Sequence, residues 1–236
     1  MGHAVMNPSS ALPGKLQTSP SLGLSFRLMQ PEPAQPRRCV ILLHGVGSNE
    51  ENMASLANDM SPDTLVILAR GPLTLGPGQY AWFRVAFGAQ GPSINAEEAE
   101  HSRQALIQFV QQVQRQYGVS ASNTVIVGFS QGGIMSASVA LSAPEIVAGF
   151  GLLSGRILPE LAPHLASRDR LTTLKAFVGH GEQDGVLPVA WAHKSDAWLN
   201  ELGVAHTLHL YPMGHGIGPA IHADFLSWLA ALNPQA

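Results

Sequence analysis

One segment of the 236-residue chain is the most informative about its fold: Val125-Ile126-Val127-Gly128-Phe129-Ser130-Gln131-Gly132-Gly133. The apolar run at its start suits a buried strand, and the small residues that follow Gly133 suit a helix. A serine between glycines at a strand-to-helix turn matches the pattern G-x-S-x-G, whose sharp turn projects the serine hydroxyl out of the sheet. The flanking glycines permit this turn because a β-carbon there would collide with neighbouring backbone. We therefore expect Ser130 to be a nucleophile.

Short apolar runs of the same kind recur along the chain and suit parallel strands that are covered on both faces. They are Cys39–Leu43, Leu65–Leu68, Phe150–Leu153 and Ala176–Val178, with further strands expected at Leu22–Met29 and Ala205–Leu210. Helical patterns lie between them: one runs from a cap at Asn95 to Gly118, and two more open at Pro188 and Pro219. This alternation predicts an α/β fold with a mostly parallel central sheet and helices on both faces.

The length and composition suit a single domain. Hydrophobic residues make up 45% of the chain, which is enough to bury a sizeable core. Residues 1–18 contain Pro, Gly and Ser without periodicity, so we expect them to form a loose lead-in. No internal repeat or long linker divides the rest, and we expect residues 19–236 to form one domain.

Charge and cysteine content exclude several classes of protein. The net charge of −3 is too small to favour a nucleic acid or an anionic membrane as a partner. No apolar run reaches the ~18 residues of a spanning helix, and residues 1–17 lack the features of a secretory signal. The single cysteine, Cys39, leaves no intrachain disulfide and no cysteine-based zinc site. We expect a cytoplasmic protein without stable membrane association, either a monomer or a homodimer.

A serine hydroxyl needs a base, and the base needs an acid to orient it. His215 lies between two glycines after the expected strand 205–210, and Asp184 follows the strand at 176–178. The carboxyl ends of parallel strands meet at one edge of the sheet, so both residues are expected near Ser130. Among the ten histidines, only His215 combines such a loop with the chain order Ser, acid, His. Glu182 is the alternative acid. The chain has no His-Glu-x-x-His pair, so we expect no metal site.

The segment His44-Gly45-Val46-Gly47-Ser48-Asn49 follows another expected strand. Its small residues would let backbone approach a reacting carbonyl, whose tetrahedral intermediate needs two N–H donors. We assign these oxyanion donors to the backbone of Val46 and of Gln131. His44 is expected to hold the loop, with a role as a second base as the alternative.

Two connections are longer than packing requires, and long loops in compact domains are often functional. Residues 70–93 contain Tyr80, Trp82 and Phe83, which we expect to form a wall of the substrate site. Residues 154–173 contain three leucines that could extend this wall into an apolar acyl groove: Leu158, Leu161 and Leu165. The alternative is that these aromatic and leucine side chains simply cover the sheet.

Together these motifs resemble the phospholipase/carboxylesterase family of small α/β-hydrolases, which includes bacterial carboxylesterases and acyl-protein thioesterases. The resemblance rests on His44–Gly47, Gly128–Gly133, Leu153–Gly155, His180-Gly181 with Asp184, and Gly214-His215, and it spans residues 40–228. It implies an α/β-hydrolase fold without a large cap domain, no cofactor, and hydrolysis of carboxylic esters or thioesters. It also implies that Ser130, Asp184 and His215 form the catalytic triad.

The chain departs from the family near the expected substrate entrance. It has Ser48 and Asn49 where family members often carry an acid, and Arg84 where an Asp commonly follows the aromatic pair. We expect a serine carboxylesterase that acts on small-molecule esters with short to medium acyl chains through an acyl-enzyme. The alternatives are an acyl-protein thioesterase or lysophospholipase acting on longer chains, a peptidase or dienelactone-type hydrolase, and a non-catalytic ligand-binding protein.

Overall fold

The computed structural model describes residues 11–19 and 21–232. Within them, a nine-stranded sheet has a core of six neighbouring parallel strands. In spatial order these are β5 (Thr64–Ala69), β4 (Arg38–Leu43), β10 (Thr124–Phe129), β11 (Gly149–Leu153), β12 (Lys175–Gly181) and β13 (Ala205–Tyr211). The expected α/β class with a mostly parallel sheet is confirmed.

The other edge of the sheet is antiparallel. The strand β3 (Ser25–Gln30) pairs antiparallel with β5, and two short strands pair with β3 in turn: β1 (Leu12–Pro13) and β2 (Gln17–Thr18). Residues 12–13 and 17–18 of the expected lead-in therefore pair with the sheet, which the prediction did not include. Strands of two residues carry no alternating pattern, so they could not be recognised from the sequence. The prediction for residues 1–10 falls outside the described residues.

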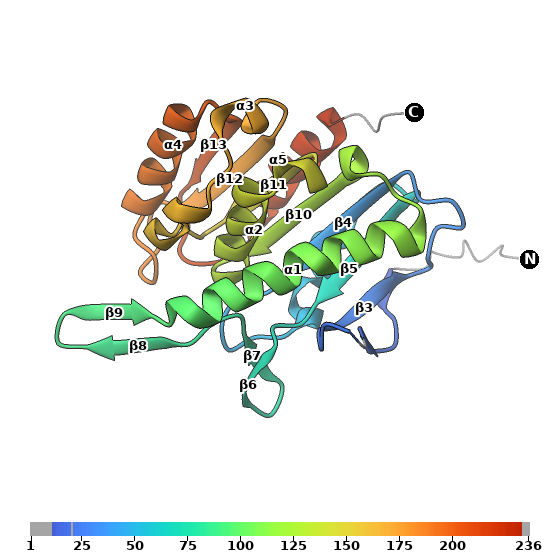
Figure 1. Cartoon of the computed structure of the whole chain (residues 1–236), viewed down its shortest axis with the longest axis horizontal. Coiled ribbons are helices and arrows are strands. Elements are labelled where there is room, and N and C mark those ends of the chain that lie inside the picture. The colour runs from blue at the N-terminus through green and yellow to red at the C-terminus, as the bar shows by residue number, and fades with distance from the viewer. Residues whose placement is uncertain (1–10, 20, 233–236) are drawn as a thin grey trace, which may run out of the picture.

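Helices cover both faces of the sheet (Figure 1). The first face is covered by α1 (Ala96–Tyr117), α2 (Gln131–Ser142), α3 (Arg168–Leu171) and α4 (Ala190–Leu202). The second face is covered by the 3₁₀ helix η1 (Glu50–Ala57) and by α5 (Pro219–Ala231). Side chains alternate across a strand, so Ile126 packs under the first layer while Val125 and Val127 pack under the second.

The ends of α1 lie where the sequence predicts them. The side chain of Asn95 accepts a hydrogen bond from the Glu98 N–H at 3.1 Å, and Gly118 adopts the left-handed conformation, with φ of 68°, that ends the helix. Three shorter 3₁₀ turns join other elements: η2 (Ala121–Asn123), η3 (Pro144–Ile146) and η4 (Pro159–His164). The helix η1 was not expected.

The connection 70–93 is not a plain loop. It folds into two hairpins, which project from the body of the molecule (Figure 1). One pairs β6 (Leu73–Gly76) with β7 (Gln79–Ala81), and the other pairs β8 (Val85–Gly88) with β9 (Gly91–Ile94). The second long connection, 154–173, contains η4 and α3. Both connections therefore contain secondary structure that the sequence analysis did not predict.

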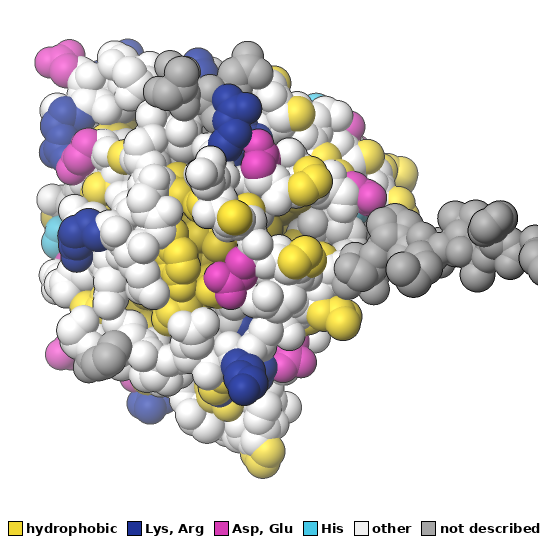
Figure 2. Space-filling view, turned by 90° about the vertical axis from the view of Figure 1, so that its right-hand side faces the viewer, with side chains coloured by type: hydrophobic (Ala, Val, Ile, Leu, Met, Phe, Trp, Pro, Cys, Tyr) yellow, Lys and Arg dark blue, Asp and Glu magenta, His cyan; other side chains and the backbone are white. Residues whose placement is uncertain are grey.

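The surface agrees with the low charge of the chain. On the face drawn in Figure 2, Lys and Arg side chains are interspersed with Asp and Glu, and apolar side chains lie between them. Among the residues that the structure describes, no helix is both long and apolar enough to cross a bilayer.

Packing under α5 offers a direct test of the core. Phe177 of β12 is fully buried, and its ring lies 5.9 Å from that of Phe225 and 5.9 Å from that of Trp228. Phe177→Ala should lower the free energy of unfolding by about 3–5 kcal/mol, because it removes buried area and leaves a cavity. Phe87, which is 85% exposed in the hairpin β8–β9, is the control. Phe87→Ala should change this free energy by less than about 0.5 kcal/mol in urea unfolding. Equal losses in the two variants would contradict the packing described.

Candidate active site

Ser130 lies at the turn between β10 and α2 in a strained conformation, with φ of 55°. Two glycines make this turn possible. A β-carbon on Gly128 would come 2.1 Å from the carbonyl carbon of Gly132, and one on Gly132 would come 2.1 Å from the Leu43 oxygen. The Ser130 N–H donates to the Leu153 carbonyl at 2.8 Å, which ties the turn to β11. Backbone packing therefore fixes the position of the Ser130 hydroxyl.

The side chains of Ser130, His215 and Asp184, which are expected to act together, are linked by two consecutive hydrogen bonds. The distance from Ser130 Oγ to His215 Nε2 is 3.0 Å, and the distance from His215 Nδ1 to Asp184 Oδ2 is 2.7 Å. A carboxylate only accepts hydrogen bonds, so Nδ1 carries the proton and Nε2 is free to accept from the serine hydroxyl. The ring of Phe129 packs on the imidazole, with 4.8 Å between ring centroids. The chain can therefore move a proton from Ser130 to His215.

Asp184 is held as a carboxylate by its own loop. Its side chain is fully buried, and its second oxygen accepts from the N–H groups of Val186 and Leu187 at 2.9 and 2.8 Å. Burial alone would raise the pKa of Asp184, but the hydrogen bonds from His215, Leu187 and Val186 outweigh it and hold that pKa below its usual value. Glu182, the alternative acid, is exposed, and its N–H donates to Tyr211 O.

A second histidine borders this acid. His180 is buried at the end of β12, where its Nε2–H donates to the Leu187 carbonyl at 2.7 Å and lies 3.4 Å from Asp184 Oδ2. Its Nδ1 is the one buried side-chain nitrogen or oxygen in the described part of the chain without a hydrogen-bond partner. The spacing His180-Gly181…Asp184 was the signal for this contact, although the sequence alone gave His180 no role.

The two predicted oxyanion donors flank the serine. Gln131 is the residue after Ser130, and a β-carbon on Gly45, the residue before Val46, would come 3.3 Å from Ser130 Cβ. Within residues 11–19 and 21–232, neither the Val46 N–H nor the Gln131 N–H donates to another group of the chain. The use of these two amides as oxyanion donors stays a prediction.

Trp82 and Phe83 do not form a substrate wall, and this corrects the prediction. Their exposed fractions are 0% and 1%, so solvent, and hence a substrate, has no access to them. The Gln131 side chain accepts from Trp82 N–H at 2.7 Å and donates to the Phe83 carbonyl at 2.7 Å, while the Trp82 indole donates to the His44 carbonyl at 2.9 Å. This clamp joins the nucleophile turn to the loop that carries Val46.

The leucines of the second connection are likewise part of the core. Leu158 and Leu161 are 3% and 4% exposed, and Leu165 packs half-buried beside them. Of the two alternatives raised by the sequence, the structure therefore favours the one in which these side chains cover the sheet.

Tyr80 and His44 both brace the loop 44–49. The Tyr80 backbone exchanges hydrogen bonds with the loop, accepting from Gly47 N–H and donating to Ser48 O, each at 2.8 Å. His44 is buried, accepts from Gly71 N–H at 2.9 Å on Nε2, and donates from Nδ1 to the Gly45 carbonyl at 2.7 Å. The geometry thus gives His44 the loop-holding role rather than that of a second base. Contact between the half-buried Tyr80 and a substrate stays a prediction.

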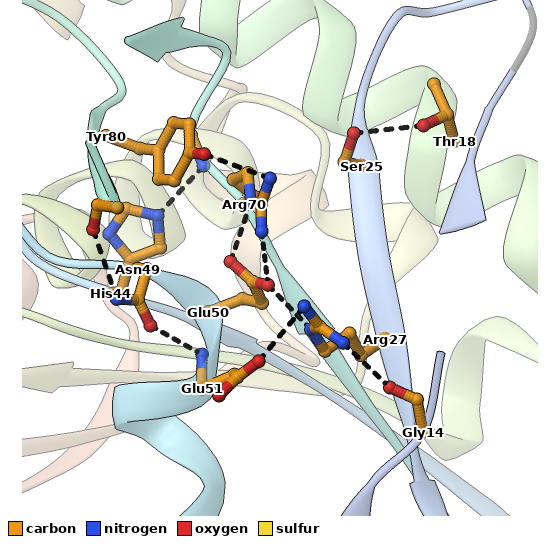
Figure 3. A network of polar contacts seen from close by, with 12 residues as sticks. Gly14, Thr18, Ser25, Arg27, His44, Asn49, Glu50, Glu51, Arg70 and Tyr80 are labelled. Atoms are coloured by element: carbon orange, nitrogen blue, oxygen red, sulfur yellow. Dashed lines mark hydrogen bonds and ion pairs between the residues drawn. The ribbon is translucent and has the colours of Figure 1, made fainter. Parts of the chain in front are cut away.

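A buried ion-pair network lies next to the same loop (Figure 3). It includes Glu50, the residue that follows the loop, and Tyr80, whose backbone is hydrogen-bonded to the loop. Glu50, which is 1% exposed, accepts from Arg27 Nε at 2.7 Å and from Arg70 Nε and a terminal nitrogen at 2.7 Å each. Arg70 also donates to the Tyr80 hydroxyl at 3.1 Å and lies over that ring. Burial alone would raise the pKa of Glu50, but the hydrogen bonds from Arg70 and Arg27 outweigh it and lower the pKa to about 2.

The sequence analysis missed this network because Glu50 lies 23 residues from Arg27 and 20 residues from Arg70. The one available signal was the acid that family members often carry after the oxyanion loop, at the place where this chain has Ser48 and Asn49. Glu50 follows directly and supplies a buried carboxylate there.

Other reactive groups offer no competing site. Cys39 is buried in β4, and burial raises the pKa of its thiol to about 12, so it stays a neutral thiol. In the described part of the chain, no group of three or more His, Cys, Asp or Glu side chains gathers in a way that could hold a metal ion.

Comparison with known proteins gives consistent relatives. A family model described as Phospholipase/Carboxylesterase matches residues 28–233. The chain is 31% identical over 202 residues to Esterase YpfH of Escherichia coli (strain K12), covering 81% of each chain. It is 30% identical over 178 residues to Acyl-protein thioesterase 1 of Kluyveromyces lactis, covering 70% of this chain and 76% of the relative. The crystal structure of a carboxylesterase from Mesorhizobium loti matches with a TM-score of 0.76 and 22% identity, covering 91% and 98% of the two chains.

The Glu50 network predicts how stability depends on pH. A carboxyl whose pKa is about 2 in the folded state stabilises the fold above its unfolded pKa of about 4.3, and this contribution declines as the pH falls towards 2. Glu50→Gln should therefore lower the free energy of unfolding by on the order of 3 kcal/mol at pH 7, and by about half as much at pH 3. Urea unfolding at both pH values measures this difference.

Glu51 is the matched control for this prediction. Its side chain is 55% exposed and pairs with the same Arg27 at 3.0 Å. Glu51→Gln should cost less than about 1 kcal/mol at either pH, because exposed ion pairs are screened by water. A Glu50→Gln variant as stable as Glu51→Gln at pH 7 would show that the buried network does not hold this part of the fold.

Proposed function

The chain belongs to the phospholipase/carboxylesterase family, and from this premise we propose that it is a serine carboxylesterase acting on short- to medium-chain carboxylic esters. Its relatives make it an ester-hydrolysing serine hydrolase with the α/β-hydrolase fold. The observation that carries the finer proposal is the hydrogen-bonded sequence from Ser130 through His215 to Asp184, at 3.0 and 2.7 Å.

In the first half of the proposed reaction, Ser130 Oγ attacks the ester carbonyl while His215 Nε2 takes its proton. Asp184 keeps the proton of the neutral ring on Nδ1 and stabilises the imidazolium that forms. The carbonyl oxygen becomes an oxyanion, which the N–H groups of Val46 and Gln131 stabilise. His215 then protonates the leaving alcohol, and the acyl group stays on Ser130.

In the second half, water replaces the alcohol. His215 takes a proton from the water, which attacks the acyl carbonyl, and the same two N–H groups stabilise the second oxyanion. When this intermediate collapses, the carboxylic acid leaves and His215 returns the proton to Ser130. The cycle requires no group beyond this chain, the ester and water.

The surroundings of Ser130 support small, accessible esters. Two apolar side chains are exposed beside the site: Val46, next to the proposed oxyanion donor, is 45% exposed, and Val186, two residues after Asp184, is 67% exposed. These two side chains form a short apolar rim, whereas the predicted wall residues Trp82 and Phe83 are buried and cannot contact a substrate. A hollow of about 280 Å³ lies between α1 and η4, and its lining mixes charged side chains with the apolar Ala96, Ala99, Leu158 and Leu161. Ser130, Asp184 and His215 do not line this hollow, so it is separate from the proposed site.

The three proposed catalytic side chains make distinct kinetic predictions. By analogy with other serine hydrolases, Ser130→Ala and His215→Ala should each lower kcat on a nitrophenyl ester by on the order of 10⁶, and Asp184→Asn by on the order of 10⁴. Glu182→Gln is the control for the acid and should leave kcat near that of the wild type. A large loss in Glu182→Gln, with little loss in Asp184→Asn, would overturn the assignment.

Acyl chain length tests the substrate class. A series of nitrophenyl esters should give its highest kcat/KM at short to medium length. An open rim buries few methylenes, and each buried methylene contributes only about 0.8 kcal/mol. A strong preference beyond about 12 carbons would mean that a groove buries the whole chain. That outcome would favour the alternative function, an acyl-protein thioesterase or lysophospholipase, for which the Kluyveromyces lactis relative is a precedent in name.

A further inference from the structure

The loop that follows β11 carries a guanidinium group, that of Arg156, which has no role in the triad. Arg156 follows Gly155, whose α-carbon packs so closely on the nucleophile turn that a β-carbon would come 3.0 Å from the Ser130 carbonyl oxygen. The preceding residue, Ser154, donates from Oγ to the Gly216 carbonyl at 3.4 Å. Arg156 therefore follows two residues that contact the site: Gly155 packs against the Ser130 turn, and the Ser154 side chain contacts the neighbour of His215.

The Arg156 side chain is held by an aromatic ring at the start of α4. Its guanidinium carbon lies 4.6 Å from the ring centre of Trp191, in the first turn of α4. The segment before α4 supplies the Val186 and Leu187 amides that bind Asp184. Arg156 and Trp191 thus join the two loops that position the nucleophile and the acid, at the sheet edge where an ester would enter.

The positive charge of Arg156 has no close counter-ion. Within residues 11–19 and 21–232, no carboxylate comes within 4 Å of it, and Glu160 acts on it only at longer range. The Lys194 ammonium lies 4.4 Å from the same Trp191 ring centre and adds a second positive charge. Of the nine other arginines, all of which lie in the described residues, five contact a carboxylate within this distance, and Arg37, Arg38, Arg115 and Arg168 do not. The five are Arg27, Arg70, Arg84, Arg103 and Arg170.

This arrangement suits an anion that arrives with the substrate. The Arg156 side chain is half-buried, and burial lowers the pKa of its guanidinium, which still keeps its proton at neutral pH. A partly buried cation without a partner is stabilised when an anion reaches it. The planar guanidinium presents a fork of N–H donors that matches the two oxygens of a carboxylate, and Trp191 keeps this plane in place.

We propose that Arg156, held by Trp191, is a carboxylate-binding subsite, so that the preferred substrates are esters that also carry a free carboxylate. A monoester of a dicarboxylic acid has this chemistry: Ser130 attacks the ester carbonyl at one end and becomes acylated, while Arg156 binds the free carboxylate at the other end. The inference rests on the proposed carboxylesterase function and adds the substrate class to it. The short methylene chain of such a monoester also fits the small apolar rim of Val46 and Val186 better than a long lipid does.

Two esters of equal acyl length test the subsite. Mono-4-nitrophenyl glutarate carries the carboxylate, and 4-nitrophenyl pentanoate is its neutral counterpart. The quantity measured is the ratio of kcat/KM for the charged ester to kcat/KM for the neutral one. Arg156→Met should lower this ratio about 10- to 100-fold, the range of a hydrogen bond to a charged group. Arg156→Lys keeps the charge but not the fork, and should lower it less.

Arg115 provides the matched control. It is exposed in the last turn of α1, so Arg115→Met removes the same charge far from the rim and should change the ratio less than about twofold. A ratio unchanged in Arg156→Met, or lowered equally in Arg115→Met, would overturn the subsite while leaving the esterase proposal intact. Wild-type protein that hydrolyses neither ester would instead disprove the proposed function, and the subsite with it. If Arg156→Met does not fold, Arg156→Lys provides the test, because the loss of the fork should still lower the ratio and an unchanged ratio would overturn the subsite.

Discussion

The close approach of two backbone segments is the constraint on which the site depends. The start of α2 packs so tightly on the end of β4 that a β-carbon on Gly132 would come 2.1 Å from the Leu43 oxygen. This contact brings the Ser130 turn beside the loop with the Val46 amide. The Gln131 side chain and the Trp82 indole then lock the two segments together. A site for an oxyanion needs such rigidity, because its donors must already point at the charge when it forms.

The parallel sheet brings the other side chains of the site together, and their positions could be predicted from the sequence. Ser130, Asp184 and His215 lie just after the ends of the parallel strands β10, β12 and β13, and parallel strands of one sheet end at the same edge. Local patterns were enough to identify these loops, because a strand, a glycine-flanked turn and a following helix are all read within about ten residues. The hydrogen bonds of 3.0 and 2.7 Å link side chains that are 85 and 31 residues apart.

Features that depend on distant partners could not be read in this way. Trp82 and Phe83 sit in a Gly- and Pro-rich connection typical of a surface loop, yet Gln131, almost 50 residues away, draws them into the core. The sequence gives Glu50 no role, because its partner Arg27 lies 23 residues before it on β3. In both cases polar groups, the backbone of Trp82 and Phe83 or the Glu50 carboxylate, are buried with a hydrogen-bond partner that is distant in sequence. Composition and local patterns do not show which distant residues will pair.

The central claim is that the fold makes one hydroxyl, that of Ser130, reactive. Treatment of the intact protein with a fluorophosphonate probe, followed by mass spectrometry of its peptides, tests this claim most directly. Phosphonylation requires a hydroxyl activated by a base and an oxyanion site that accepts the phosphoryl oxygen. One adduct per chain is expected, on the peptide that contains Ser130, and it should be lost in His215→Ala. No adduct, or an adduct on another residue, would contradict the claim.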